Sequence, residues 1–281
     1  MPNILCYFTH KTALIFGGGK GIGRAVAIEL AQRRCHVVIA DLDEVAAHET
    51  VVRITETGGQ AAACACNVLD QQSVEAAVQF ARDSIGLPDI IINNVGAMLN
   101  GHPEDIPMSE WERIMDLNYF SVVRSLRAIL SEFLQRGTGH IVNTASFAGL
   151  YPYAASRLPY AAAKSAIIAL TQSLALYLEP KGIRVSCFIP GPVVSDILAS
   201  MTSWTPDCAM RGPGADLEII DAQKAARILA DGMNDEKIMI ATDHHAWNIL
   251  AEWAQSPDDF LRAKMEAFER GDLGLPSLPT G

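Results

Sequence analysis

The chain has 281 residues, of which 49% are hydrophobic and 19% charged, and its formal net charge is -10. These values are typical of one large folded domain. The acidic balance, with no run of Lys or Arg, argues against nucleic acid and against an anionic membrane surface as partners.

Short apolar runs alternate with amphipathic helical patterns along the chain. The runs predict strands at 12–16, 35–40, 61–66, 89–93, 140–145, 183–189 and 237–241, and the patterns predict helices at 21–33, 44–56, 73–84, 109–135, 160–178 and 221–230. Such alternation implies parallel strands joined by right-handed helical crossovers. We therefore expect a single α/β domain of the doubly wound Rossmann type, with a parallel seven-stranded sheet flanked by helices.

Two segments depart from this alternation. Residues 195–218 form a long irregular stretch, and such a stretch inside a compact domain usually has a function. We expect a substrate-binding lid there. Residues 243–270 continue as helix and 273–281 are rich in Gly and Pro, so 243–281 is expected to form an atypical helical extension.

The first predicted strand runs directly into a glycine-rich turn, Gly17-Gly18-Gly19-Lys20-Gly21-Ile22-Gly23, and a helix follows. Glycines at such a turn let backbone amides approach a pyrophosphate at a helix N-terminus. The strand before the turn and the helix after it favour a dinucleotide site over a simple helix entry turn.

Asp41 closes the second predicted strand, where the adenosine ribose of a dinucleotide would lie. A carboxylate there accepts hydrogen bonds from the ribose hydroxyls and repels a 2′-phosphate. Lys20 favours the opposite outcome, because a cation in the loop could pair with that phosphate. We give Asp41 more weight and predict NAD, with NADP less favoured. Asp41 could instead cap the following helix, a role that Asp43 can fill equally well.

Tyr160 and Lys164 are four residues apart in a predicted helix, so their side chains project from one face. A tyrosine normally titrates near ~10, and a nearby cation lowers that pKa. The pair could therefore move a proton in an alcohol–ketone reaction. The alternative is an ordinary surface pair.

Several motifs occur in an order that resembles the classical short-chain dehydrogenase/reductase family, over roughly residues 11–196. They are the glycine loop, Asn93-Asn94-Val95-Gly96 after the fourth strand, Asn118 in a helix, Ser146 after the fifth strand, the Tyr160–Lys164 pair, and Pro190-Gly191-Pro192-Val193 after the sixth strand. The resemblance implies an oxidoreductase that transfers a hydride between a secondary alcohol or ketone and a nicotinamide cofactor.

The resemblance also implies a role for each catalytic residue. Tyr160 takes the hydroxyl proton during oxidation or donates one during reduction. Ser146 holds the substrate oxygen. Lys164 binds the nicotinamide ribose and lowers the pKa of Tyr160, and Asn118 orders a water that links Lys164 to solvent.

The expected cofactor-binding residues are Gly17, Gly19, Lys20, Gly21, Ile22, Gly23, Asp41, Leu42, Asn67, Val68, Asn94, Val95, Gly96, Tyr160, Lys164, Pro190, Gly191, Val193 and Ser195. The expected substrate-binding residues are Ser146, Ala148, Tyr153, Tyr160, Met201 and Trp204. The substrate is expected to be apolar, cyclic or aromatic, and the protein is expected to form a homodimer or homotetramer.

The chain departs from the family pattern at a few positions. Phe16 stands where the family usually has Thr, Asn67 where it has Asp, and Ser195 where Thr is common. The family's Asp-Gly-Gly after the last strand is replaced by Asp243-His244-His245. Because adjacent histidines usually point in different directions, we expect no metal site there. The family often forms a subunit interface at this end, so the departure concerns assembly and not the chemistry.

Two other functions use related features. A nucleotide-sugar epimerase or dehydratase also uses Tyr-x-x-x-Lys, but its glycine spacing would require glycine at Arg24. A non-catalytic NAD-sensing regulator could share the fold, but such proteins typically lack the tyrosine that is present here.

Six cysteines are scattered along the chain, and no second pair or histidine cluster completes a metal site. Free thiols in a reducing cytosol are therefore expected. The first ten residues lack the pattern of a signal peptide, and no apolar run approaches the ~20 residues of a membrane span. These features predict a cytoplasmic protein.

Overall fold

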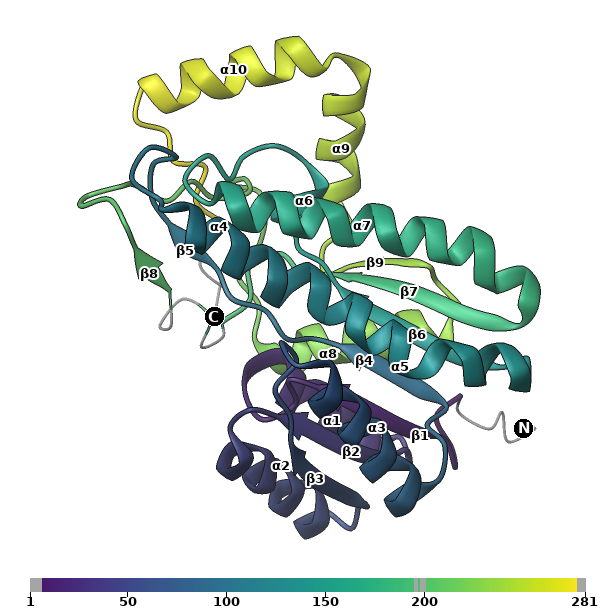
Figure 1. Cartoon of the computed structure of the whole chain (residues 1–281). Helices are drawn as coiled ribbons and strands as arrows, with labels where there is room; N and C mark the ends of the chain where they lie inside the picture. Colours follow the sequence, from purple (N-terminus) through teal and green to yellow (C-terminus); the bar gives the residue numbers. More distant parts are fainter. Residues whose placement is uncertain (1–6, 195–196, 198–200, 277–281) are drawn as a thin grey trace.

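The computed structural model describes residues 7–194, 197 and 201–276, and its core is a seven-stranded sheet (Figure 1). The strand order is β3-β2-β1-β4-β6-β7-β9, and every pairing is parallel. The strands are β1 Thr12–Phe16, β2 His36–Asp41, β3 Ala61–Ala65, β4 Ile90–Asn93, β6 Gly139–Thr144, β7 Ile183–Ile189 and β9 Met239–Ala241. The prediction of a doubly wound α/β fold with a parallel seven-stranded sheet is confirmed.

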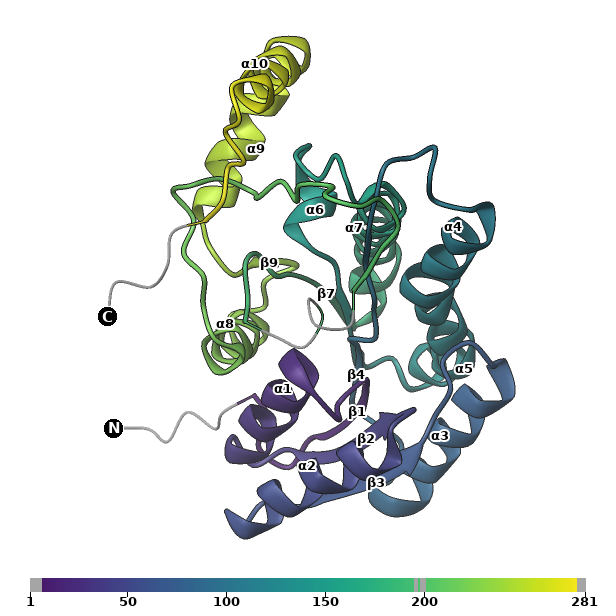
Figure 2. The same cartoon turned by 90° about the vertical axis from the view of Figure 1, so that its left-hand side faces the viewer.

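Helices cover both faces of this sheet (Figure 2). On one side lie α1 Gly21–Gln32, α2 Glu44–Glu56 and α8 Ala222–Asn234, and on the other α3 Gln71–Ile85, α5 Ser121–Arg136 and α7 Leu158–Leu178. The alternation of side chains along each strand explains this arrangement. In β1, Leu14 packs into the core with α3, α5 and α7, whereas Ile15 packs into the core with α1, α2 and α8.

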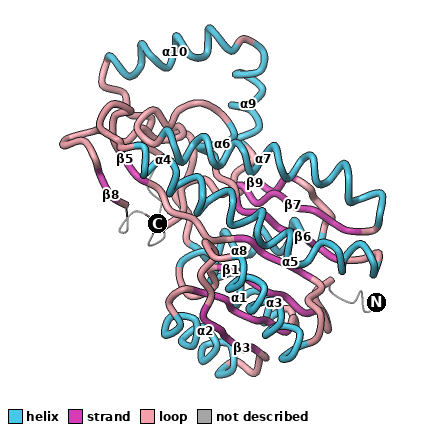
Figure 3. Tube along the Cα trace, viewed as in Figure 1, coloured by secondary structure: helices cyan, strands magenta, loops and turns pink. Residues whose placement is uncertain are grey.

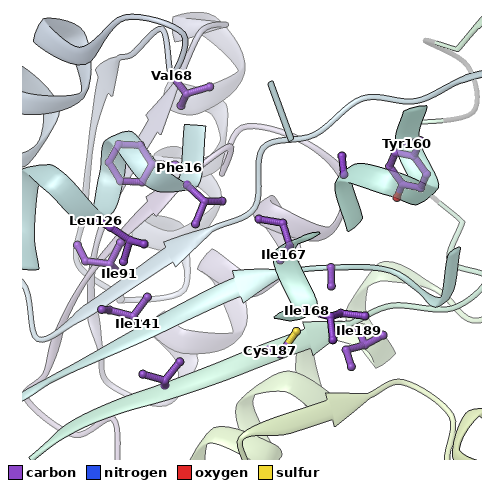
Figure 4. Close-up of a cluster of buried hydrophobic side chains, with 14 of the residues drawn as sticks. Phe16, Val68, Ile91, Leu126, Ile141, Tyr160, Ile167, Ile168, Cys187 and Ile189 are labelled. Carbon is purple, nitrogen blue, oxygen red and sulfur yellow. The ribbon is translucent and has the colours of Figure 1, made fainter. Parts of the chain in front are cut away.

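The two cores consist mainly of buried aliphatic side chains, with some aromatic and sulfur-containing ones. Burying one such residue contributes roughly 1.5–3 kcal/mol. In Figure 4, Ile167 and Ile168 of α7 lie close to Cys187 of β7. This packing fixes α7 against the sheet, and Tyr160 near the start of α7 belongs to the same core cluster. The apolar contacts therefore set the position of the predicted catalytic helix.

The helix predicted at 109–135 is divided into three parts. α4 Met108–Met115 and α5 are joined by a π-helical turn, η1 Asp116–Phe120. A π-helical turn inserts an extra residue into a helix and is frequent at functional sites. It contains Asn118, whose side chain is buried.

Three short elements were not predicted (Figure 3). α6 Phe147–Leu150 follows Ser146, and β5 Leu99–Asn100 pairs in parallel with β8 Thr202–Ser203. The β5–β8 pair fastens part of the 195–218 segment to the loop after β4, and Asn100 Nδ2 adds a hydrogen bond to the Cys208 carbonyl at 2.9 Å. These contacts join segments about a hundred residues apart, which is why no local pattern indicated them.

The C-terminal part forms two helices, α9 His245–Gln255 and α10 Pro257–Glu269. Both stand away from the sheet in Figures 1 and 2. The chain then returns to the 195–218 segment, where Gly212 N–H donates to the Leu273 carbonyl at 2.7 Å and Gly214 N–H donates to the Gly274 carbonyl at 3.0 Å. The extension is therefore attached by its backbone to the segment predicted as a lid.

One stretch of the described chain, Leu158–Lys181, is long and apolar enough to cross a membrane by length and composition. The sequence pattern had not predicted this. The stretch contains α7, which packs against α6 and β7 and buries Ile167 and Leu178 completely. Core helices of folded domains commonly have such a composition.

His140 lies on β6 with its side chain completely buried. Its Nδ1 lies 3.0 Å from the Tyr7 hydroxyl and its Nε2 lies 3.0 Å from Ser186 Oγ. Ser186 Oγ donates in turn to the Lys237 carbonyl. Burial, together with the positive charges of Arg184 and Lys11, lowers the pKa of His140 to about 3. The folded protein therefore holds a neutral imidazole.

This burial predicts a loss of stability in mild acid. Below a pH of about 6.5 the histidine takes up a proton in the unfolded chain but not in the folded one, so falling pH favours unfolding. Between pH 7 and pH 5 the free energy of unfolding should fall by about 2 kcal/mol more in the wild type than in His140→Gln. Denaturant titrations at the two pH values measure this difference.

His48→Gln is the control for this comparison, because His48 is exposed on α2. Its pH dependence should match that of the wild type. Equal pH dependence of the wild type and His140→Gln would contradict the prediction.

Candidate active site

The strand order reverses between β1 and β4, and this is where the cleft opens. From β1 the chain proceeds outward to β2 and β3, and then crosses back to β4 on the other side of β1. In open parallel sheets, ligands bind beyond the carboxyl ends of the strands at such a reversal. A cavity of about 460 Å³ lies at the ends of β1, β2, β4 and β6.

Most of the predicted cofactor residues line this cavity. They are Gly17, Lys20, Gly21, Ile22, Asp41, Leu42, Asn67, Val68, Asn94, Val95, Gly96, Tyr160, Lys164, Pro190, Gly191 and Val193. Residues that line it without having been predicted are Cys66, Leu69, Leu117, Thr144, Ala145 and Ile197. Thr144 and Ala145 directly precede Ser146 at the end of β6. This position was the one sequence signal that could have identified them as cavity-lining residues. Ser195 lies outside the described residues.

Gly19 and Gly23 shape the loop but do not line the cavity. Gly17 has a φ of +80°, which favours glycine. A Cβ on Gly23 would lie 1.8 Å from the Gly17 carbonyl oxygen, so only glycine permits this approach of helix to loop. α1 begins at Gly21 without a side-chain cap. Its first amides are therefore available to an anion at the helix N-terminus.

Asp41 is held by the glycine loop. Its Oδ2 accepts the Gly19 N–H at 2.8 Å, and its Oδ1 accepts the Asp43 N–H at 3.0 Å. The cap of α2 is Asp43, which accepts the Ala46 N–H. The alternative role of Asp41 as the cap of that helix is therefore excluded. Lys20, the loop cation, forms an ion pair with Asp43 at 2.7 Å.

At the opposite end of the cavity, Ser146, Tyr160 and Lys164 come together. Ser146 caps α6 and its Oγ accepts the Ala148 N–H at 3.2 Å. The hydroxyl of Ser146 lies close enough to Tyr160 to lower the pKa of its phenol. Lys164 is buried, and its Nζ donates to the Thr144 carbonyl at 2.9 Å while lying 5.6 Å from the centre of the Tyr160 ring. The three side chains form one contiguous group.

Burial determines the protonation of this group. It raises the pKa of Tyr160, while the Ser146 hydroxyl and the charge of Arg157 act in the opposite direction. Burial also lowers the pKa of Lys164 to about 8. The expected lowering of the Tyr160 pKa by Lys164 is not the dominant effect in this structure. Arg157, which sequence reasoning missed, is the cation whose charge acts on the phenol.

A series of hydrogen bonds between buried polar side chains connects the sheet to α7. Asn93 Nδ2 donates to Asn143 Oδ1 at 2.8 Å, and Asn143 Nδ2 donates to Thr171 Oγ1 at 3.1 Å. Asn94 Nδ2 donates to the Gly17 carbonyl, which holds the end of β4 against the glycine loop. These bonds cross three elements, and hydrogen-bonded buried polar groups fix the relative position of the elements they join.

Asn118 lies behind Gly96 in the π-helical turn. Its Nδ2 donates to the carbonyls of Ala97 and Ile114, both at 2.9 Å, and its Oδ1 is buried without a partner among the described residues. A Cβ on Gly96 would lie 2.7 Å from that oxygen and 3.2 Å from Lys164 Nζ. The absence of a side chain at Gly96 thus leaves a small polar space that both groups border.

The remaining predicted substrate residues do not line the cavity. Ala148 and Tyr153 are buried beside it in the core, and Met201 packs against the same core. Trp204 is 38% exposed, because β8 pairs with β5 and holds its backbone beside Asn100. The structure therefore brings together the cofactor and catalytic residues, but not this substrate set.

The two histidines after β9 lie together, contrary to expectation. The rings of His244 and His245 are 4.5 Å apart, and His245 Nδ1 lies 3.0 Å from Asp243 Oδ1. Ligand atoms of the three residues lie within 4.8 Å of one another. Both histidines are exposed, and the cluster is separate from the cavity lining.

Comparison with known proteins agrees with this geometry. Residues 11–206 match the model of the short chain dehydrogenase family. The chain is 36% identical over 193 residues to a cyclohexanol dehydrogenase of Acinetobacter sp. strain SE19, which covers 68% of this chain and 76% of that protein.

Two solved structures have a similar fold. One is a 7 alpha-hydroxysteroid dehydrogenase complexed with NADH and 7-oxo glycochenodeoxycholic acid, with a TM-score of 0.71 and 28% identity, covering 83% of this chain and 93% of that one. The other, a short chain dehydrogenase/reductase from Burkholderia phymatum in complex with NAD, has a TM-score of 0.76 and 24% identity, covering 97% and 99%. The chain therefore belongs to the short-chain dehydrogenase/reductase family of oxidoreductases.

Proposed function

We propose that the protein is an NAD-dependent dehydrogenase that interconverts an apolar cyclic secondary alcohol and its ketone, with Tyr160 as the general base and acid. The observation that carries this proposal is that Ser146 and the buried Tyr160 and Lys164 line one end of a cleft whose other end is a glycine loop. An alcohol oxidation needs a proton acceptor next to a nucleotide site, and this arrangement provides one.

The cleft residues fit a nicotinamide dinucleotide. The loop around Gly17 and Gly23 has no room for side chains, and the uncapped start of α1 suits a pyrophosphate. Asp41 lines the cavity at the end of β2, where its carboxylate would accept hydrogen bonds from ribose hydroxyls and repel a 2′-phosphate. When bound, the nicotinamide supplies or accepts the hydride.

Lys20 does not reverse the preference for NAD over NADP that we assign to Asp41. Its ammonium group is engaged by Asp43, so the loop cation is partly neutralised by its own neighbour. The carboxylate of Asp41 is positioned from two sides by the amides of Gly19 and Asp43. These contacts support NAD over NADP.

Ser146 and Tyr160 handle the substrate oxygen. Ser146 is near enough to act on the pKa of Tyr160, so a single substrate oxygen could contact both hydroxyl groups. Ser146 orients that oxygen, and Tyr160 removes its proton during oxidation or returns one during reduction. Because burial raises the pKa of Tyr160, the phenolate needs positive charge nearby.

Lys164 and Asn118 provide a route for the proton. A lysine whose pKa is about 8 can exchange its proton near neutral pH. The unpartnered Oδ1 of Asn118 borders the space beside Lys164 Nζ, and a water bound there would have two polar partners. We therefore assign Asn118 to a proton relay with Lys164.

The substrate class rests on two relatives whose names specify it, a cyclohexanol dehydrogenase and a hydroxysteroid dehydrogenase. Both names describe an alcohol on an alicyclic ring. The aromatic residues Tyr151 and Tyr153, 5.4 Å apart between ring centres, follow Ser146 closely in this chain. Both rings belong to the core behind Ser146, so we propose that residues 201–218 supply the apolar cover over a substrate bound at Ser146 and Tyr160.

The epimerase or dehydratase alternative is disfavoured by Arg24. Its Nε donates to the Gly19 carbonyl at 2.7 Å and its guanidinium pairs with Glu49. This side chain supports the loop from the position where that alternative would require glycine.

We also propose a homodimer or homotetramer in the cytoplasm. α4 and η1 expose Met108 and Phe120, which are 68% and 48% accessible. Both residues line a surface hollow together with Trp111 and Met115. A second copy would cover these side chains. The five described cysteines are free, which suits a reducing compartment.

Replacing Tyr160 with Phe removes the hydroxyl that moves the proton. NADH formation from cyclohexanol should fall by roughly a hundredfold to ten-thousandfold, the usual contribution of a general base. The NADH dissociation constant, measured by fluorescence, should change little. Tyr177→Phe, at the exposed end of the same helix, is the matched control and should retain full activity.

One outcome would contradict the mechanism, and a different one would contradict the proposed function. A Tyr160→Phe enzyme with more than a tenth of the wild-type rate would exclude Tyr160 as the base. If the wild type binds NADH tightly but oxidises none of a panel of cyclic and aromatic alcohols, the NAD-sensing regulator would be the better reading.

Replacing Asp41 with Asn keeps the shape and an acceptor oxygen but removes the charge that repels a 2′-phosphate. The ratio of kcat/KM for NAD to that for NADP should fall about tenfold or more. Asp70→Asn is the control, because Asp70 caps α3. An unchanged ratio in Asp41→Asn would show that another group selects the cofactor.

A further inference from the structure

Arg157 is a buried cation at the start of the helix that carries Tyr160. It is the N-cap residue of α7, three positions before Tyr160, and its carbonyl accepts the Ala161 N–H at 2.9 Å. Only 8% of the residue is accessible. An arginine remains charged at ordinary pH, so a full positive charge is enclosed next to the reaction site.

The surroundings of Arg157 leave its charge uncompensated. Within the described residues, no carboxylate lies within ion-pair distance of its guanidinium. The Nε is buried and has no hydrogen-bond partner there. A buried charge without a counter-ion is costly. Such a charge is retained more readily where an anion forms beside it during function.

The contacts that Arg157 does make hold it between the tyrosines and the 195–218 segment. One terminal nitrogen donates to the Arg211 carbonyl at 2.5 Å. The guanidinium carbon lies 5.4 Å from the centre of the Tyr153 ring. The guanidinium is therefore fixed from two directions, one of them the segment predicted to cover the substrate.

Tyr160 is the group on which this charge acts. The positive charge of Arg157 opposes the rise in the Tyr160 pKa that burial causes, as does the Ser146 hydroxyl. The other titratable and charged groups around the two residues are Tyr151 and Tyr153 in the loop after α6, Lys164 on α7, Arg211 in the 195–218 segment, and Asp243, whose charge acts on Tyr151.

We propose that Arg157 is a positioning residue that stabilises the phenolate form of Tyr160 electrostatically and that is itself held in place by the Arg211 carbonyl. The inference rests on the proposed function of Tyr160 as the general base. Arg157 would then be a second cation, in addition to Lys164, that stabilises the Tyr160 phenolate. The 195–218 segment would thereby contribute to catalysis through one backbone carbonyl.

The test compares Arg157→Met with Arg157→Lys. Methionine keeps much of the apolar stem but removes the charge, and lysine restores a charge. The rate of cyclohexanol oxidation with NAD should fall about tenfold at neutral pH in Arg157→Met, because less phenolate forms. The rate should recover as the pH is raised, so the rising limb of the pH profile moves to higher pH. Arg157→Lys should restore most of the wild-type profile.

Arg227→Met is the matched control, because Arg227 is an exposed arginine on α8. It should leave both rate and pH profile unchanged. A uniform loss of rate in Arg157→Met at every pH, with the wild-type profile shape, would reduce Arg157 to a structural role and overturn the proposal. A wild-type profile combined with a raised KM only for substrates that carry a carboxylate would overturn it in favour of substrate binding.

A second measurement separates this proposal from the proposed function. The Tyr160 phenolate can be titrated by ultraviolet absorbance in the NAD complex, with Tyr160→Phe as the background, whether or not the chosen alcohol is oxidised. Tyr160 should titrate at higher pH in Arg157→Met than in the wild type. Equal titration curves would refute the role of Arg157 even if the enzyme is an active dehydrogenase.

Discussion

The reversal of strand order between β1 and β4 is the constraint on which the rest of the structure depends. Because all the paired strands run parallel, their carboxyl ends lie along one edge. The chain leaves β1 and β4 in opposite directions, so no crossover fills the space above them. The glycine loop, Asp41 and Ser146 all follow strand ends at this edge. Their proximity is a product of topology, although Ser146 is more than a hundred residues from the other two in the chain.

Burial has two opposite effects at this edge. It fixes the catalytic helix, because α7 shares its core with β7 and is joined to β6 by the hydrogen bond from Asn143 to Thr171. The same burial disfavours charge on Tyr160 and on Lys164. The burial that makes the site rigid therefore also disfavours the charged forms of these two side chains. If Tyr160 acts as the proposed base, cations and hydrogen-bond donors near the phenol must offset this effect of burial.

The sequence was informative wherever the signal was local. Apolar runs located the strands of the sheet, and the spacing of Tyr160 and Lys164 identified their shared helix face. The π-helical turn around Asn118 was not predicted, because its one-residue shift in the apolar pattern lies inside a long helical stretch that continues on both sides. The pairing of β5 with β8 depends on contacts across about a hundred residues. Arg157 belongs to no motif, and its burial and its contact with the Arg211 carbonyl exist only in the folded chain.

The backbone bonds from Gly212 and Gly214 to Leu273 and Gly274 have a consequence for how this protein can diversify. A Cβ on Gly212 would lie 2.3 Å from the Gly274 carbonyl oxygen, so the seam tolerates almost no change in side chain. Residues 212–214 and 273–274 are therefore coupled through their backbones, so a change in the position of one stretch must shift the other. The residues that line the cavity at the sheet edge take no part in these bonds, so the two stretches can be altered together without touching that lining.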